Sequence, residues 1–208
     1  MGQRNTMLRS MHDAGLAAWF GGSLMGAVGL NGAASGVGRR DERLRLSAAG
    51  WRRWAPVNLA AIGTHLLGAS ALLATERHRV AAQRGVAGMS AAKTGLTLAA
   101  LGATAYAGVL GARLGKAGRV PVDGPTRAAE DTPDEVRAVQ RQQRVMQWGV
   151  PALTGALIAI SALAGEQQKP APVMRGLVGR MGQLGNVGKL ASLTKPAVAT
   201  TVGRMLAK

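Results

Sequence analysis

The sequence predicts an all-α integral membrane protein, a bundle of four transmembrane helices followed by a basic C-terminal tail. Four stretches contain no Asp, Glu, Lys or Arg over about 20 residues, the length that a helix needs to cross a bilayer. Small residues are abundant, with 30 Gly among 208 residues, whereas only four Trp, one Tyr and one Phe are present. Basic residues gather between the apolar stretches and give a net charge of +16. We therefore expect a membrane domain over residues 1–168 and a Gly-rich basic tail over 169–208.

The first expected span covers residues 14–38 and carries an ordered set of glycines. A seven-residue repeat keeps one face of a slightly supercoiled helix, and a G-x-x-x-G pair falls within it. Glycine on such a face lets another helix backbone approach closely. We expect a helix-packing face, internal or between protomers, made of Gly15, Gly22, Gly26, Gly29 and Gly36.

Two other interpretations of the apolar stretches stay open. Arg4 and Arg9 followed by Ala33-Ala34-Ser35 satisfy the pattern of a cleaved signal peptide, although Asp13 and the length of the apolar run disfavour it. A soluble bundle of buried Ala-rich helices is the alternative to the membrane, but four such apolar runs are rare in soluble domains.

The remaining spans are expected at 54–75, 94–112 and 145–165. Trp51, Trp54 and Trp148 stand at span ends that would share one side of the bilayer, as an interfacial aromatic belt does. Before the fourth span, Thr132 as N-cap with Glu135 three residues later predicts a capping box. That helix should run from the loop directly into the fourth span.

The loops are rich in arginine, and we expect these arginines to contact lipid head groups or a partner. The 39–53 loop contributes six, Arg39, Arg40, Arg43, Arg45, Arg52 and Arg53. The charge distribution mildly favours the 39–53 and 113–144 loops on the cytoplasmic side. Nucleic-acid recognition is disfavoured because no base-stacking aromatic residues alternate with these charges. The tail is either an interfacial amphipathic segment or disordered.

Few residues offer chemistry. His65 is the one ionisable side chain deep in an expected span, and intramembrane ionisable residues are functional candidates by default. The absence of an Asp or Glu at similar depth favours the alternative, a histidine that only contributes to packing. Asn31 and Asn58 are polar candidates at similar depth. Cys is absent, and no acid–base pair, nucleotide-binding loop or metal-ligand pattern is recognisable. We expect no catalytic, cofactor or metal site, and no enzyme.

The opening "MHDAGLAAWFGGSLM" resembles the first span of bacterial four-helix membrane proteins of the copper-resistance protein D type, through His12, Trp19, Gly21 and Gly22. Its composition also resembles that of actinobacterial membrane proteins. The resemblance covers about fifteen residues and implies a multi-pass protein of the bacterial inner membrane, linked to metal handling; the rest of the chain offers no ligand set for that role.

The function that these features favour is an accessory or scaffold subunit, which self-associates or joins a larger membrane complex through close helix packing. One alternative is a small transporter or channel with His65 in the path. Another is a module that binds anionic lipid head groups through its arginine loops.

Overall fold

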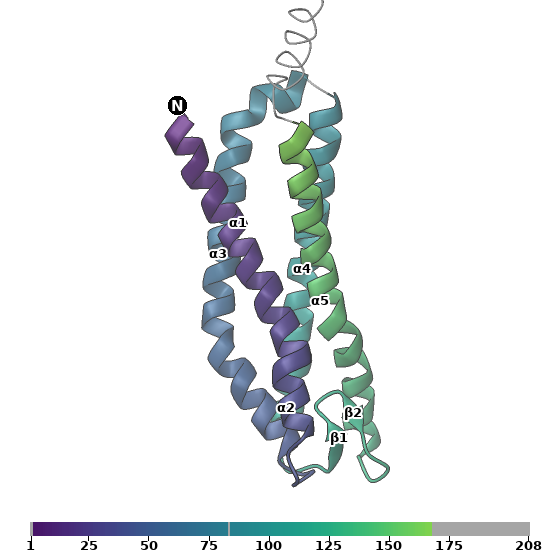
Figure 1. Ribbon diagram of the computed structural model, residues 1–208. Coiled ribbons are helices and arrows are strands. Elements are labelled where there is room, and N and C mark those ends of the chain that lie inside the picture. The colour runs from purple at the N-terminus through teal and green to yellow at the C-terminus, as the bar shows by residue number, and fades with distance from the viewer. Residues whose placement is uncertain (1, 83, 168–208) are drawn as a thin grey trace, which may run out of the picture. The chain divides into compact units, whose positions relative to one another are not determined.

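The computed structural model describes residues 2–82 and 84–167, and most of them are helical (Figure 1). The helices up to Ala164 belong to one compact unit. Side chains are described over residues 6–75 and 88–163, apart from a few positions near the ends. The tail over 169–208, with its two interpretations, lies outside the described residues.

Four long helical segments follow one another along the described part of the chain, and the protein is mostly helical, as the sequence predicted. The first consists of α1 (Gly2–Met25), a π-helical turn η1 (Gly26–Leu30) and α2 (Asn31–Ser35). Next come α3 (Arg43–Ala82), α4 (Arg84–Lys116) and α5 (Asp134–Gln167). The helix of the 113–144 loop does continue into the fourth apolar stretch, so Pro151 lies inside α5.

Three of these helices are long and apolar enough to cross a membrane within the described part of the chain. The qualifying segments are Arg43–Thr75, Gly88–Lys116 and Asp134–Leu163. Only 11% of the apolar window of α4 is buried inside the protein, so most of that helix presents its side chains outward. The first segment does not qualify, because the chain from Gly2 to Ser35 is divided by the π-helical turn and its α1 portion carries polar and charged residues.

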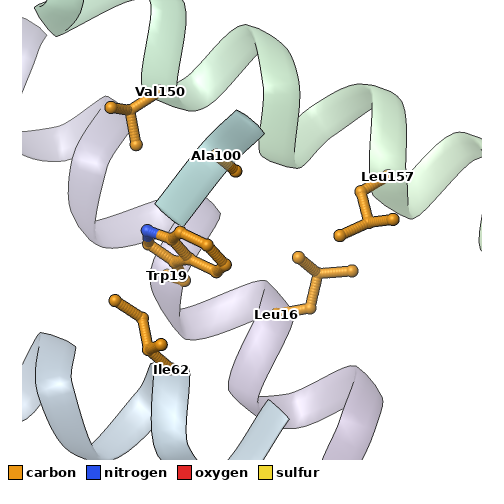
Figure 2. Packing of buried hydrophobic residues seen from close by; sticks show 6 residues of the cluster. All are labelled: Leu16, Trp19, Ile62, Ala100, Val150 and Leu157. Atoms are coloured by element: carbon orange, nitrogen blue, oxygen red, sulfur yellow. The ribbon is translucent and has the colours of Figure 1, made fainter. Parts of the chain in front are cut away.

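The core lies where the four segments meet around Trp19 (Figure 2). Trp19 is fully buried, and its indole Nε1 donates to Thr104 Oγ1 of α4 at 3.1 Å. The cluster draws on every long helix and consists of Leu16, Trp19, Ile62, Ala100, Val150 and Leu157. A Trp in this position ties α1 to α4 by both packing and a hydrogen bond.

A short β-hairpin that the sequence did not predict follows α4. Strands β1 (Val122–Gly124) and β2 (Arg127–Ala128) pair antiparallel. Gln140 of α5 is buried beneath the hairpin, and its Nε2 donates to Gly124 O at 2.9 Å and to Pro125 O at 3.2 Å. The hairpin is therefore fixed to the start of α5, at the end of the bundle where α2 also lies (Figure 1).

The predicted capping box at the start of α5 is wrong. The Thr132 hydroxyl donates to Pro121 O at 2.7 Å and accepts from the Ala129 backbone N–H, so it joins the loop instead of capping the helix. The helix begins at Asp134, whose carboxylate and that of Glu135 lie in its first turn. Acidic side chains at this position favour the helix through its dipole.

Candidate functional site

Among the helices that the structure describes, α1 and α3 make the most extensive contact, and they run antiparallel (Figure 1). A Cβ added at Gly15 would lie 2.5 Å from His65 N and 2.5 Å from Ala61 O. A Cβ added at Gly68 would lie 2.5 Å from His12 N and 2.8 Å from Leu8 O. At both positions the obstacle is backbone, which cannot rotate away. The two backbones therefore approach as closely as glycine permits.

These two contacts are reciprocal. Each helix carries a His-x-x-Gly sequence, His12 to Gly15 in α1 and His65 to Gly68 in α3. The glycine of each sequence lies against the backbone of the histidine of the other. The two tetrapeptides can be recognised in the sequence, but only the structure shows that they pack against each other.

Further along the same face, the glycines of α1 accommodate large side chains of α3. The indole of Trp54 lies against Gly22, and that of Trp51 lies against Gly26. Leu30 in turn lies against Gly50 of α3. Trp51 and Trp54 thus pack on α1, whereas Trp148 is half-exposed; the expected interfacial belt stays a prediction.

Gly29 and Gly36, the other two members of the expected packing face, contact no other helix. A Cβ at Gly29 would meet only the Met25 side chain, and one at Gly36 only Ala33 O. The π-helical turn at Gly26–Leu30 explains this, because its i→i+5 bonds accommodate an extra residue per turn and shift the seven-residue pattern off the α3 face. Asn31 and Ala34 are buried instead.

His65 is completely buried and lies against His12, with ring centroids 4.4 Å apart and planes tilted by 46°. Its Nδ1 lies 3.1 Å from the backbone oxygen of His12. A carbonyl can only accept, so Nδ1 carries the hydrogen and Nε2 is the bare nitrogen. Among the described residues, Nε2 of His65 has no hydrogen-bond partner. Neither Asn31 nor Asn58 is the partner of this imidazole.

The ring of His12 is oriented by Asp13, which lies outside the contact between α1 and α3. Its Nδ1 lies 2.7 Å from Asp13 Oδ1, and the Asp13 carboxylate is largely exposed. Carbonyl and carboxylate partners fix the orientation of an imidazole ring and its tautomer. Groups of three or more His, Asp or Glu residues arranged to hold a metal ion are absent from the described part of the chain.

Asn31 forms a polar cluster where the π-helical turn ends. Its Oδ1 accepts from Ser47 Oγ at 2.8 Å and from Trp51 Nε1 at 3.3 Å, and its Nδ2 donates to Gln147 Oε1 at 3.0 Å. The cluster links α2, α3 and α5. Asn58 takes no part: it is half-buried on α3, and its Oδ1 has no partner among the described residues.

The six arginines of the 39–53 loop divide into three groups. Arg40 pairs with Asp123 at 2.7 Å, and Arg43 donates to the backbone oxygens of Val37, Val122 and Asp123, so both hold the hairpin against α3. Arg39 pairs with Asp41, and its hydrogen bond holds the pKa of that exposed carboxyl below the usual value. The three that remain exposed without a described partner are Arg45, Arg52 and Arg53.

Comparison with protein-family models, with curated proteins and with solved structures found no match to this chain. The resemblance of the first segment to copper-resistance proteins of the D type therefore stays a prediction. The arrangement of the side chains alone supports the functional proposals below.

Proposed function

We propose that this protein is a four-span membrane protein that serves as an accessory or scaffold subunit through close helix packing. Large apolar side chains exposed on the long helices support insertion in a membrane, since water disfavours such surfaces and lipid does not. They include Leu59, Leu67, Leu98, Val109 and Leu163, each half or more exposed. A bacterial inner membrane is the location that the expected family resemblance implies.

The observation that carries the scaffold proposal is the free face of α4. Gly95 and Gly102 are exposed, seven residues apart, with no atom within 4 Å of an added Cβ. Leu98 and Val109 lie on the same side of the helix and are 63% and 50% exposed. Gly15, Gly22 and Gly26 are already covered by α3, whereas nothing in the described part of the chain covers the α4 face, which leaves it as a small-residue surface for another subunit.

Replacing Gly95 and Gly102 with leucine tests this proposal. The added side chains would hold a partner helix away from the α4 backbone without touching the interior of the protein. The measurement is the native mass after gentle detergent extraction from the native membrane. We expect the assembly to be lost, whether it is a homo-oligomer or a complex with other subunits.

Gly108→Leu is the matched control, because this exposed glycine also has no atom within 4 Å of an added Cβ. It lies about 120° around the helix from Gly102 at 3.6 residues per turn. An assembly that survives the paired leucines, or that is lost equally with Gly108→Leu, would contradict the proposal. Extraction without detergent would contradict membrane insertion itself.

A further inference from the structure

We propose that His12 and His65 bind one proton between them, and that this proton separates α1 from α3 at the level of Gly15 and Gly68. Their ring centroids are 4.4 Å apart in a buried contact. Two positive imidazoles at this separation would repel each other strongly, so the second proton is opposed. The pair therefore titrates as one unit and not as two independent histidines.

The neutral state of the pair is defined by its hydrogen bonds. His65 donates from Nδ1 to the backbone oxygen of His12, and His12 donates from Nδ1 to Asp13. Each ring therefore has a bare Nε2 that is able to accept a proton. The Nε2 of His65 faces no acceptor among the described residues, so an N–H formed there has no hydrogen bond.

The charged groups near the pair come from two helices. On α1, Asp13 contacts His12, and Arg9 lies one turn earlier. On α4, Lys93 is a positively charged group near His65. The apolar stretches 54–75 of α3 and 145–163 of α5 contain no ionisable side chain apart from His65. Asp13 contacts His12 from the exposed side, and nothing buried among these groups neutralises a charge that lies between the two rings.

The cost of a buried positive charge is therefore lowered most directly when water reaches the two rings. The contact at this level depends on the close approach at the two glycines and on the hydrogen bond to the His12 carbonyl. A charged ring draws water into this contact, because a buried unpaired N–H or charge is costly. The other end of the α1–α3 contact is held by Trp51, Trp54 and Leu30, none of which can take up a proton.

The first arm of the test counts protons. The chain has three histidines, so a His78→Asn background leaves only the pair for nitrogen NMR of labelled histidine in detergent micelles. We expect uptake of one proton between about pH 8 and 5, the range in which histidine titrates. Replacing His12 with asparagine should move the titration midpoint of His65 by about one pH unit or more.

The second arm measures separation. The chain has no Cys, so spin labels at Ser10→Cys and Ser70→Cys report on the histidine end, and labels at Val28→Cys and Arg53→Cys report on the tryptophan end. We expect the first distance to increase with the uptake of the proton and the second to stay constant. Two independent protons, an unchanged midpoint, or protonation without a change in the first distance would each overturn the proposal.

Asp13→Asn keeps the experiment decisive if His12→Asn does not fold. This variant keeps both imidazole rings and changes a largely exposed side chain, and it removes the carboxylate that favours a charge on His12. The midpoint of the pair should then fall to lower pH, and an unchanged midpoint would count against the shared site. The site belongs to the α1–α3 contact, so its failure is separate from any failure of assembly through α4.

Discussion

Gly15→Ala should separate two helices by the width of one methyl group. The added Cβ would lie 2.5 Å from both His65 N and Ala61 O, whereas ordinary contact begins at 3.4 Å. Because both obstacles are backbone atoms, α1 and α3 must move apart by about 0.9 Å. The hydrogen bond from His65 Nδ1 to the His12 carbonyl, now 3.1 Å long, would then exceed the range of a hydrogen bond.

The cost follows from three contributions. Overpacking costs about 1–3 kcal/mol, and loss of the hydrogen bond adds about 1 kcal/mol. Replacing a helical glycine with alanine offsets about 1 kcal/mol of this. We therefore expect the free energy of unfolding to fall by about 2 kcal/mol. Gly21→Ala and Gly63→Ala are the controls, because an added Cβ there meets nothing within 4 Å; they should leave stability unchanged or raise it.

The double variant Gly15→Ala, Gly68→Ala is the sharper test. Both glycines lie at the same level of the antiparallel pair, so one separation relieves both clashes. The double variant should cost about as much as either single variant, which is a coupling energy of about 2 kcal/mol. Unfolding in mixed detergent–SDS micelles, followed by tryptophan fluorescence, measures the free energy of unfolding of the parent protein, of each single variant and of the double variant. Additive costs, or a Gly15→Ala variant as stable as the controls, would refute the reasoning.

Three further predictions concern the polar contacts. Asn31→Leu should destabilise the fold by about 2–3 kcal/mol, because it leaves several buried polar groups without partners; a loss below about 1 kcal/mol in the same unfolding assay would contradict this. Arg43→Ala should raise amide hydrogen exchange in the β1–β2 hairpin, measured by mass spectrometry, whereas Arg45→Ala should not. Thr104→Val should cost about 1 kcal/mol through loss of the hydrogen bond, and Trp19→Phe should cost more because it also leaves a gap in the core. Combining them should cost little more than Trp19→Phe alone, and full additivity would argue against that bond.

The helical segments and part of the packing face could be predicted because both depend on patterns of neighbouring residues in the sequence. Apolar runs of about 20 residues set the helices. A seven-residue repeat placed Gly15 and Gly22 on one side of α1, and both lie against α3. The same repeat failed after Gly26, because nothing in a hydropathy pattern signals a π-helical turn.

The partners of the polar residues could not be predicted, because they come from distant positions along the chain. His65 donates a hydrogen bond to the backbone oxygen of His12, and a list of polar side chains at similar depth does not reveal a backbone partner. Arg40 and Arg43 looked like free basic residues of a loop, yet they bind a hairpin some 80 residues away in sequence, at separations of 79 to 83 residues. Arginine composition alone does not distinguish a side chain that binds backbone oxygens from one that faces lipid.

The α1–α3 contact also sets an order for assembly during synthesis. Every residue that forms it, from Leu8 to Gly68, precedes α4 in the chain. The two helices can therefore dock as soon as the first third of the protein has left the ribosome. The Trp19 bond to Thr104 and the Asn31 bond to Gln147 must wait for α4 and α5. A helical hairpin that is already closed would then receive the later helices one at a time, and a substitution at Gly15 or Gly68 would act on the earliest step.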